Sequence, residues 1–183
     1  MKRILLGILA ASALSAPTTA APRDPDVGAY LAARTASIES DFDAAVRYFA
    51  RALAHDPSNP ALMEGLLIAQ AAIGEWTRAV PVARRLLEIE ADNPVGNLVL
   101  LVDAEARDDH DLVLRRIADG KGIGGFPDAL LSAWAQYGKG DVAAALATFD
   151  RAAKDPTAAP LALTHKAYAL ASAGDFEAAE RIL

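Results

Sequence analysis

The sequence predicts an all-α protein, an α-solenoid of about five antiparallel helix-turn-helix repeats of which the last is incomplete. Of 183 residues, 53% are hydrophobic but only 6% are aromatic, so the core must consist mainly of small and aliphatic side chains, as in closely packed helices. Small or branched residues also recur along the chain at steps of 34, 34, 32 and 34 residues, namely Ala45, Ala79, Val113, Ala145 and Ala179. A fixed period of this length is typical of stacked helical pairs.

The first twenty residues predict a secretory signal peptide. Lys2 and Arg3 precede an apolar run over 4–14, and small residues follow up to Ala20. The run is short for a permanent membrane anchor, although a retained interfacial helix is the alternative interpretation. The chain has no Cys that could carry a lipid or form a disulfide. We therefore expect a soluble periplasmic protein without a stable membrane anchor after cleavage, with full secretion as the alternative.

The charge argues against two classes of partner. The formal net charge is −6, and losing Lys2 and Arg3 with the signal would change it to −8, because residues 1–20 contain no acidic residue. A negative field opposes phosphate backbones and anionic lipid surfaces. We expect no nucleic-acid binding and no electrostatic membrane docking.

Residues 21–27 predict a linker because Pro22 and Pro25 disfavour a helix. The repeat domain is expected over 28–183. Its first unit contains a helix from Ala29 to Ser40 and a second helix that follows Asp41 as N-cap and ends before Pro57. The predicted units lie near 26–59, 60–93, 94–125, 126–159 and 160–183.

Every later second helix is expected to begin as the first one does. The entry residues in register are Phe42, Trp76, His110, Val142 and Phe176. Three turns, at 73–75, 139–141 and 173–175, place Gly where one helix ends and an acidic residue where the next begins. The small residues of the period would let the paired helices approach closely.

Three places interrupt the regular pattern. Pro81 lies inside a helix expected from about 75 to 90, which predicts a kink near 77–81. A helix from Asp111 to about Ala118 leads into a segment with four glycines at 120–125, which predicts a hinge or exposed loop and explains the shorter step. Because the last unit ends part-way along a second helix, we expect the sequence to be a fragment of a longer repeat protein.

The second helices resemble those of tetratricopeptide repeats. That family places Ala, an aromatic residue, Ala and Pro at the positions of Ala45, Phe49, Ala52 and Pro57, and Ala145, Phe149 and Ala152 repeat the pattern. Two other units match this pattern less closely, with Ala79, Ala83 and Leu86 in the second unit and Val113 and Ile117 in the third. The first-helix signature of the family is largely missing, and the first unit has Ala29, Ala32, Ala33 and Ala36 in that helix. The resemblance implies a superhelical scaffold whose first helices line a concave, partner-binding groove.

The repeat register places a mostly apolar set of residues in this groove. One row is Arg34, Ile68, Val102, Trp134 and Tyr168, and its neighbour is Tyr30, Glu64, Leu98, Leu130 and Thr164. Such a surface suits an extended or helical peptide with apolar anchors. The alternative is that Leu98, Val102 and Leu130 are core residues. The carboxylate clamp of some family members is absent, since only Arg34 supplies a positive charge.

The sequence predicts no catalytic, cofactor or metal site. Gly120 to Gly125 fits G-x-G-x-x-G, but a helix precedes it and Pro127 follows at once, so a connector is expected instead of a dinucleotide site. The run 108–111 holds three Asp and one His, which favours a turn with an N-cap over a cation site. The three histidines, His55, His110 and His165, occupy different repeat positions.

The function hypothesis is therefore a non-enzymatic interaction scaffold that binds a peptide or protein partner in the groove, in the assembly of an envelope complex. An alternative is the N-terminal docking or dimerisation arm of a larger exported enzyme whose catalytic domain lies beyond Leu183. A third alternative is a self-association module.

Overall fold

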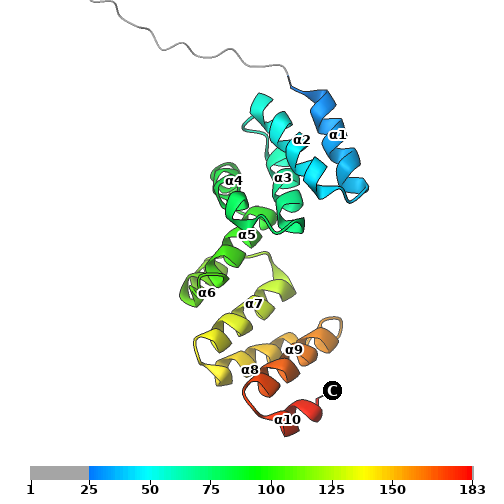
Figure 1. The fold of residues 1–183 in the computed structure, drawn as a ribbon. Coiled ribbons are helices and arrows are strands. Elements are labelled where there is room, and N and C mark those ends of the chain that lie inside the picture. Colours follow the sequence, from blue (N-terminus) through cyan, green and yellow to red (C-terminus); the bar gives the residue numbers. More distant parts are fainter. Residues whose placement is uncertain (1–24, 183) are drawn as a thin grey trace, which may run out of the picture.

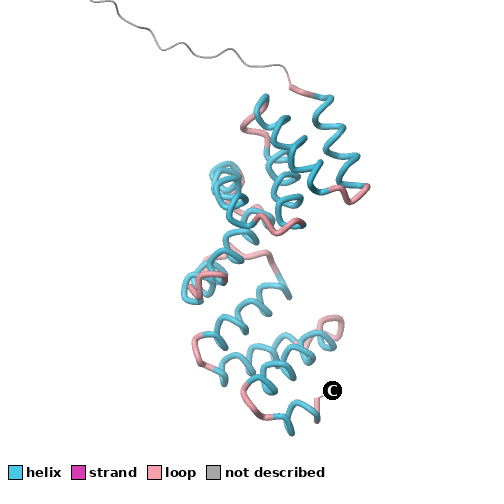
Figure 2. The backbone as a smooth tube through the Cα atoms, in the orientation of Figure 1, coloured by secondary structure: helices cyan, strands magenta, loops and turns pink. Residues whose placement is uncertain are grey.

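The computed structural model describes residues 25–182, so the predicted signal peptide and most of the predicted linker lie outside the described residues. The described part is entirely helical, without a strand (Figures 1 and 2), which confirms the all-α prediction. Its helices are α1 (Val27–Ile38), α2 (Phe42–His55), α3 (Pro60–Ala72), α4 (Trp76–Ile89), α5 (Pro94–Glu105), α6 (His110–Ala118), α7 (Gly125–Gly138), α8 (Val142–Ala152), α9 (Ala159–Ser172) and α10 (Phe176–Glu180).

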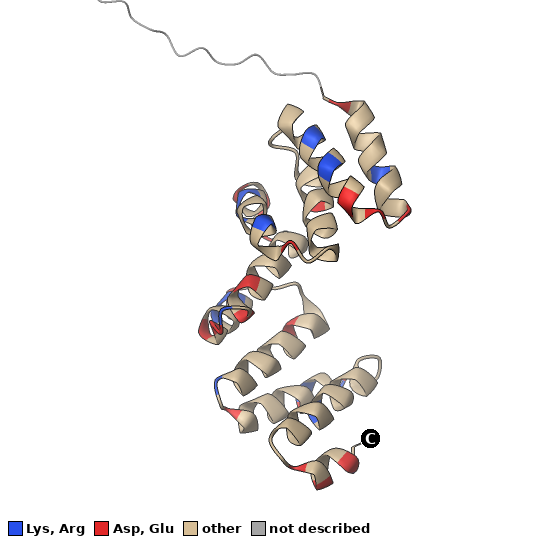
Figure 3. Ribbon diagram, in the orientation of Figure 1, with Lys and Arg blue, Asp and Glu red and all other residues tan. Residues whose placement is uncertain are grey.

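The helices stack in successive pairs from α1 at one end to α10 at the other (Figure 1). Each helix packs against the next along the chain, which is the contact pattern of a solenoid. Both signs of charge occur along the whole stack (Figure 3). The predicted solenoid architecture is confirmed.

The even-numbered helices begin at the predicted entry residues because a capping side chain precedes most of them. Asp41, Asp109, Asp141 and Asp175 each accept a hydrogen bond of 3.0–3.1 Å from the backbone N–H three residues further on. Such N-caps satisfy one of the free donors of a helix start. Glu75, which precedes α4, makes no side-chain cap bond.

The starts of α3 and α5 share another capping arrangement, which was not among the predicted features. Asn59 and Asn93 stand 34 residues apart, and each is followed by Pro at the first helical position. Each Asn side-chain oxygen accepts hydrogen bonds from two backbone N–H groups of its helix. Asn at the N-cap and Pro at the first position favour a helix start at the same place in two units.

The turns between paired helices adopt the same backbone conformation throughout. Gly74, Gly140 and Gly174 have φ of 78°, 85° and 89°, in the left-handed region that glycine adopts without strain. The equivalent positions in the first and third units are Ser40 and Asp108, with φ of 61° and 56°. Positive φ therefore recurs with the period of the sequence.

The five small residues of the period are all buried, with exposures from 0 to 6%. The core consists of successive clusters that each span three consecutive helices: α1 to α3, α3 to α5, α5 to α7, and α7 to α9. A last cluster joins α9 and α10. Each of α3, α5, α7 and α9 therefore contributes to two neighbouring cores.

The beginning of α1 corrects one predicted boundary. α1 starts at Val27, so the predicted linker over 21–27 runs into the helix. The reason is local: Asp26 accepts a 2.9 Å hydrogen bond from Ala29 N–H as N-cap, and Pro25 stands just outside the helix.

The helix that follows the glycine-rich segment begins earlier than predicted. α7 begins at Gly125, inside the glycine run, with Pro127 in its first turn, where a missing N–H costs nothing. The prediction that Pro127 keeps a helix from opening there was therefore wrong, and the unit boundary at 125/126 falls one residue inside α7. The Asp128 carboxylate accepts hydrogen bonds from Ile123 N–H at 2.7 Å and Gly124 N–H at 3.0 Å.

Ile123 also packs against the core of α5, α6 and α7. The segment 119–124 is thus a connector held at its C-terminal end, although several of its residues are exposed. α4 is assigned as one helix from Trp76 to Ile89 that contains the exposed Pro81, and the kink predicted there stays a prediction.

Candidate partner-binding surface

We call the surface of the odd-numbered helices the inner layer, because two neighbouring pairs of them pack on each other across units. α3 packs directly on α5, and α7 on α9, whereas no two even-numbered helices of the described chain pack on each other as extensively. In a curved stack, the helices in closer contact with their equivalents lie on the inside of the curve. The predicted groove residues are on these odd helices.

The ten predicted groove residues are all at least partly accessible, and none belongs to the buried set. Ile68 and Tyr168 are 54% and 55% exposed, and Tyr30 is 38% exposed. Arg34 is exposed as well, and the half-buried ones are Glu64, Leu98, Val102, Leu130, Trp134 and Thr164. Leu98 and Val102 belong to no core cluster, whereas Leu130 packs partly on the α7 to α9 core.

At the C-terminal end of this layer, the structure brings Trp134, His165 and Tyr168 together. Trp134 Nε1–H donates a 3.0 Å hydrogen bond to His165 Nδ1, so the neutral His165 ring carries its proton on Nε2. The His165 ring lies 6.1 Å from that of Tyr168 in an edge-to-face contact. Trp134 also packs edge-to-face on buried Phe149 at 5.7 Å. Trp134 is therefore partly a core residue.

His165 was not predicted as a member of this surface. Its ring stacks on Phe149 with an interplanar angle of 19°. The signal that could have found it is spacing: His165 follows Phe149 by 16 residues, just as Gly65 follows Phe49. The residue at this position packs on the signature aromatic of the preceding helix.

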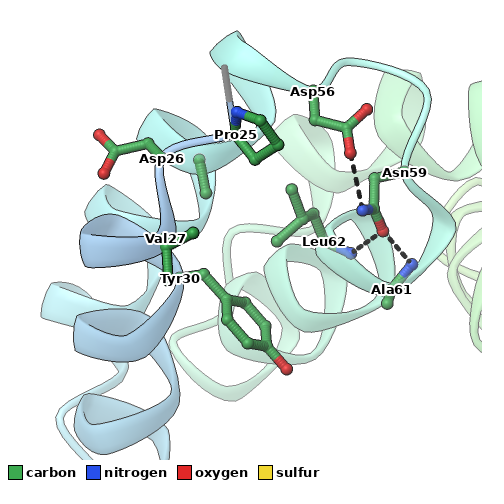
Figure 4. A pocket seen from close by; sticks show the side chains of 9 residues that line it. Pro25, Asp26, Val27, Tyr30, Asp56, Asn59, Ala61 and Leu62 are labelled. Atoms are coloured by element: carbon green, nitrogen blue, oxygen red, sulfur yellow. Dashed lines mark hydrogen bonds between the residues drawn. The ribbon is translucent and has the colours of Figure 1, made fainter.

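At the N-terminal end, Tyr30 lines a cavity of about 250 Å³ between α1 and the start of α3 (Figure 4). Val27 and Leu62 supply further apolar lining, and Asp26 and Asp56 stand at its edge. The Asp26 carboxylate is already engaged by Ala29 N–H and, at 2.8 Å, by Arg51, and these contacts hold its pKa below the usual 3.8. Asp56 accepts a hydrogen bond from Asn59 Nδ2 at 2.8 Å.

Glu64 has a structural role in the inner layer. Its carboxylate accepts a hydrogen bond from Asn93 Nδ2, and Asn93 caps α5. Glu90 accepts from the same amide nitrogen at 2.9 Å. Glu64 thereby joins α3 to the start of α5, so its carboxylate is partly committed within the fold.

The polar turn at 108–111 engages its side chains with separate partners. Asp109 caps α6, His110 Nδ1 lies 2.9 Å from Glu105 Oε2, and Asp111 pairs with Lys139 at 2.5 Å. The hydrogen bond from Lys139 lowers the pKa of Asp111. Within the described residues, no group of three His, Asp or Glu side chains could hold a metal ion.

Two further observations concern a phosphate site in the glycine segment and a membrane-spanning helix. The backbone N–H groups of Ile123 and Gly124 are occupied by Asp128, so the glycine segment presents no free cradle for a phosphate at these groups. Across residues 25–182, no helix has the length and apolar character needed to cross a membrane.

A comparison of the sequence with models of protein families shows to which family the chain belongs. Two models described as tetratricopeptide repeat match residues 37–100 and 130–183, which together make up more than half of the chain. The chain belongs to the tetratricopeptide-repeat family. Repeats of this family generally act as scaffolds for protein–protein interaction, and its members are generally not enzymes. None of the curated proteins matches the sequence significantly.

Solved structures of similar tetratricopeptide-repeat fold include three of MamA. MamA from residue 41 to its end, from Desulfovibrio magneticus RS-1, has a TM-score of 0.71 at 17% identity, covering 88% of this chain and 93% of that one. The MamA RS-1 ArsTM double mutant has a TM-score of 0.71 at 16% identity, covering 88% of this chain and 92% of that one. Another structure, a crystal structure of MamA, has a TM-score of 0.69 at 13% identity, covering 85% of this chain and 86% of that one. These similarities support the shared solenoid fold.

Proposed function

We propose that this tetratricopeptide-repeat protein is a non-enzymatic scaffold that binds a peptide or protein segment along the odd-numbered helices. The observation that supports it is the exposure of Ile68 and Tyr168, which are more than half accessible on the inner layer. Apolar side chains on an inner face are the anchors that a partner covers.

The layer offers an apolar contact at each end. Tyr30 and its cavity lie at the N-terminal end, and Tyr168 with Trp134 and His165 lies at the C-terminal end. A partner with apolar side chains at both ends of a helical or extended segment fits this arrangement, and each fully buried anchor contributes about 1.5–3 kcal/mol. The acidic chain favours basic residues at the margins of that segment.

The test compares two pairs of substitutions. The inner pair is Ile68→Ser with Tyr168→Ala. The control pair is Ile89→Ser with Tyr48→Ala, which changes the same residue types on the even helices α4 and α2, where Ile89 and Tyr48 are 47% and 38% exposed. Trp134 is unsuitable because its packing on Phe149 and its hydrogen bond to His165 link it to the core.

Peptides are selected from a random displayed library on the full chain, and their affinities for the variants are measured by fluorescence anisotropy. We expect the inner pair to weaken binding at least about ten-fold and the control pair to leave it unchanged, since a few central anchors dominate such interfaces. Circular dichroism melting serves as the folding control. Equal affinities for the two pairs would refute the assignment of the inner layer.

We further propose that the scaffold works in the periplasm, in the assembly of an envelope complex. The support is the pattern of residues 1–20, with Lys2 and Arg3 before an apolar run. A fusion of residues 1–20 to a reporter enzyme that is active only after export should be active. An inactive fusion with the protein retained in the cytoplasm would refute this location.

A further inference from the structure

A second cavity lies on the opposite side of the stack, between the even-numbered helices α4 and α6. It has a volume of about 270 Å³ and is lined by Arg84, Leu87, Glu88, Ala91, Leu100, Arg116 and Lys121. On α5 it touches Leu100, whereas the inner-layer residues of that helix are Leu98 and Val102. With 3.6 residues per turn, Leu100 points about 160–200° away from either of them. The cavity is therefore separate from the inner face.

The lining is basic although the protein is acidic. Arg84, Arg116 and Lys121 supply three positive charges from α4, α6 and the segment after α6, and Glu88 supplies one negative charge, so the lining has a net charge of +2 in a chain of −6. Among residues 25–182, none of these three cations forms an ion pair. Figure 3 shows basic segments on α4 and α6.

Arg116 is held without a counter-charge. Its Nη2 donates a 2.6 Å hydrogen bond to Asn97 Oδ1, and Asn97 is fully buried on α5. Arg116 Nε and Asn97 Nδ2 are buried donors that find no acceptor within the described residues. Burial also lowers the pKa of Arg116. A partly desolvated cation with only a neutral partner is unfavourable until an anion approaches it.

We propose that this cavity binds a doubly charged oxoanion of the phosphate class, either free or as a monoester. A phosphate carries close to two negative charges at neutral pH, which would neutralise the lining, and planar guanidinium groups such as those of Arg84 and Arg116 suit its oxygens. The ammonium of Lys121 adds a third donor. The site does not depend on the proposed function of the inner face.

Binding is measured on the full chain by calorimetry and NMR with inorganic phosphate at constant ionic strength. We expect saturable one-to-one binding, and Arg84→Gln and Lys121→Gln should each weaken it about ten-fold. Both side chains are exposed and make no hydrogen bond within residues 25–182, so folding is not at risk. The matched control is Arg85→Gln, which removes the same charge from α4 outside the cavity and should bind as the wild type does.

Two further probes define the ligand. O-phosphoserine that binds more tightly than phosphate identifies a monoester site, and the reverse order identifies a site for the free anion. Acetate at equal ionic strength should bind at least about ten-fold more weakly than either, because it carries one charge. The proposal is overturned if neither phosphate nor O-phosphoserine saturates the chain below about 10 mM, if acetate binds equally well, or if Arg85→Gln weakens binding as much as Arg84→Gln.

Discussion

Replacement of Gly65 by Ala tests the packing at the junction between the first and second repeats. Gly65 lies in the middle of α3, where Ala would ordinarily be the better helix former by about 0.5–1 kcal/mol. A Cβ at this position, however, would meet three atoms of the Phe49 ring closer than 3.0 Å. Phe49 is only 3% exposed, so the ring has no solvent into which it could turn.

Overpacking a filled core costs about 1–3 kcal/mol, which exceeds the gain in helix propensity. We therefore expect Gly65→Ala to lower the free energy of unfolding by about 1–2 kcal/mol. In a Phe49→Leu background the ring is gone, and the same substitution should be neutral or stabilising. The coupling energy between the two sites should then be about 1–3 kcal/mol.

The assay is urea unfolding followed by circular dichroism for the wild type, both single variants and the double variant. Gly96→Ala is the control, because its Cβ would meet flexible Leu87 side-chain atoms at 3.0–3.1 Å and the side chain can yield. A Gly65→Ala protein more stable than the wild type, or additive effects with Phe49→Leu, would refute this account of the junction.

Three other substitutions test separate parts of the fold. Ala45→Leu should cost about 1–3 kcal/mol because Ala45 is fully buried, and an unchanged melting midpoint would contradict the repeat register. Gly122→Ala should cost about 1 kcal/mol in urea unfolding, because its Cβ would displace the Asp128 carboxylate from the backbone N–H groups that it binds. Asp26→Ala should lower the melting temperature at neutral pH, because the folded-state pKa of Asp26 is held below 3.8 mainly by Ala29 N–H. This loss should shrink as pH falls below 3.8 through the lower folded-state pKa, and a difference that is constant from pH 7 to pH 2 would contradict it.

The regular part of the fold could be predicted because it depends on positions that repeat. The small residues of the period are buried, and the entry residues begin the even-numbered helices. Even Ser40 and Asp108, where the period has no Gly, adopt the left-handed backbone of the other turns. A repeated packing environment imposes the same backbone conformation on residues with different side chains.

The cavity between α4 and α6 could not be predicted in this way. Arg84 belongs to the second unit and Arg116 and Lys121 to the third, and the three occupy no shared repeat position, so their meeting depends on how these two helix pairs are rotated. One hint of a polar site was present in the sequence, because Asn97 is an amide within a mostly apolar helix. The hydrogen bonds that fix the end of the glycine segment could not be predicted, because the carboxylate that accepts them, Asp128, lies beyond the glycines, in the first turn of the next helix.

The sharing of odd-numbered helices between adjacent cores limits how this protein can be shortened or recombined. α3 places Leu62 and Leu66 in the core with α1 and α2, and Met63 and Leu67 in the core with α4 and α5. A truncated protein that began at α3 would therefore expose an apolar strip that another helix pair had covered. Engineers who trim the array should place polar residues on that strip, or join units that carry a matching surface.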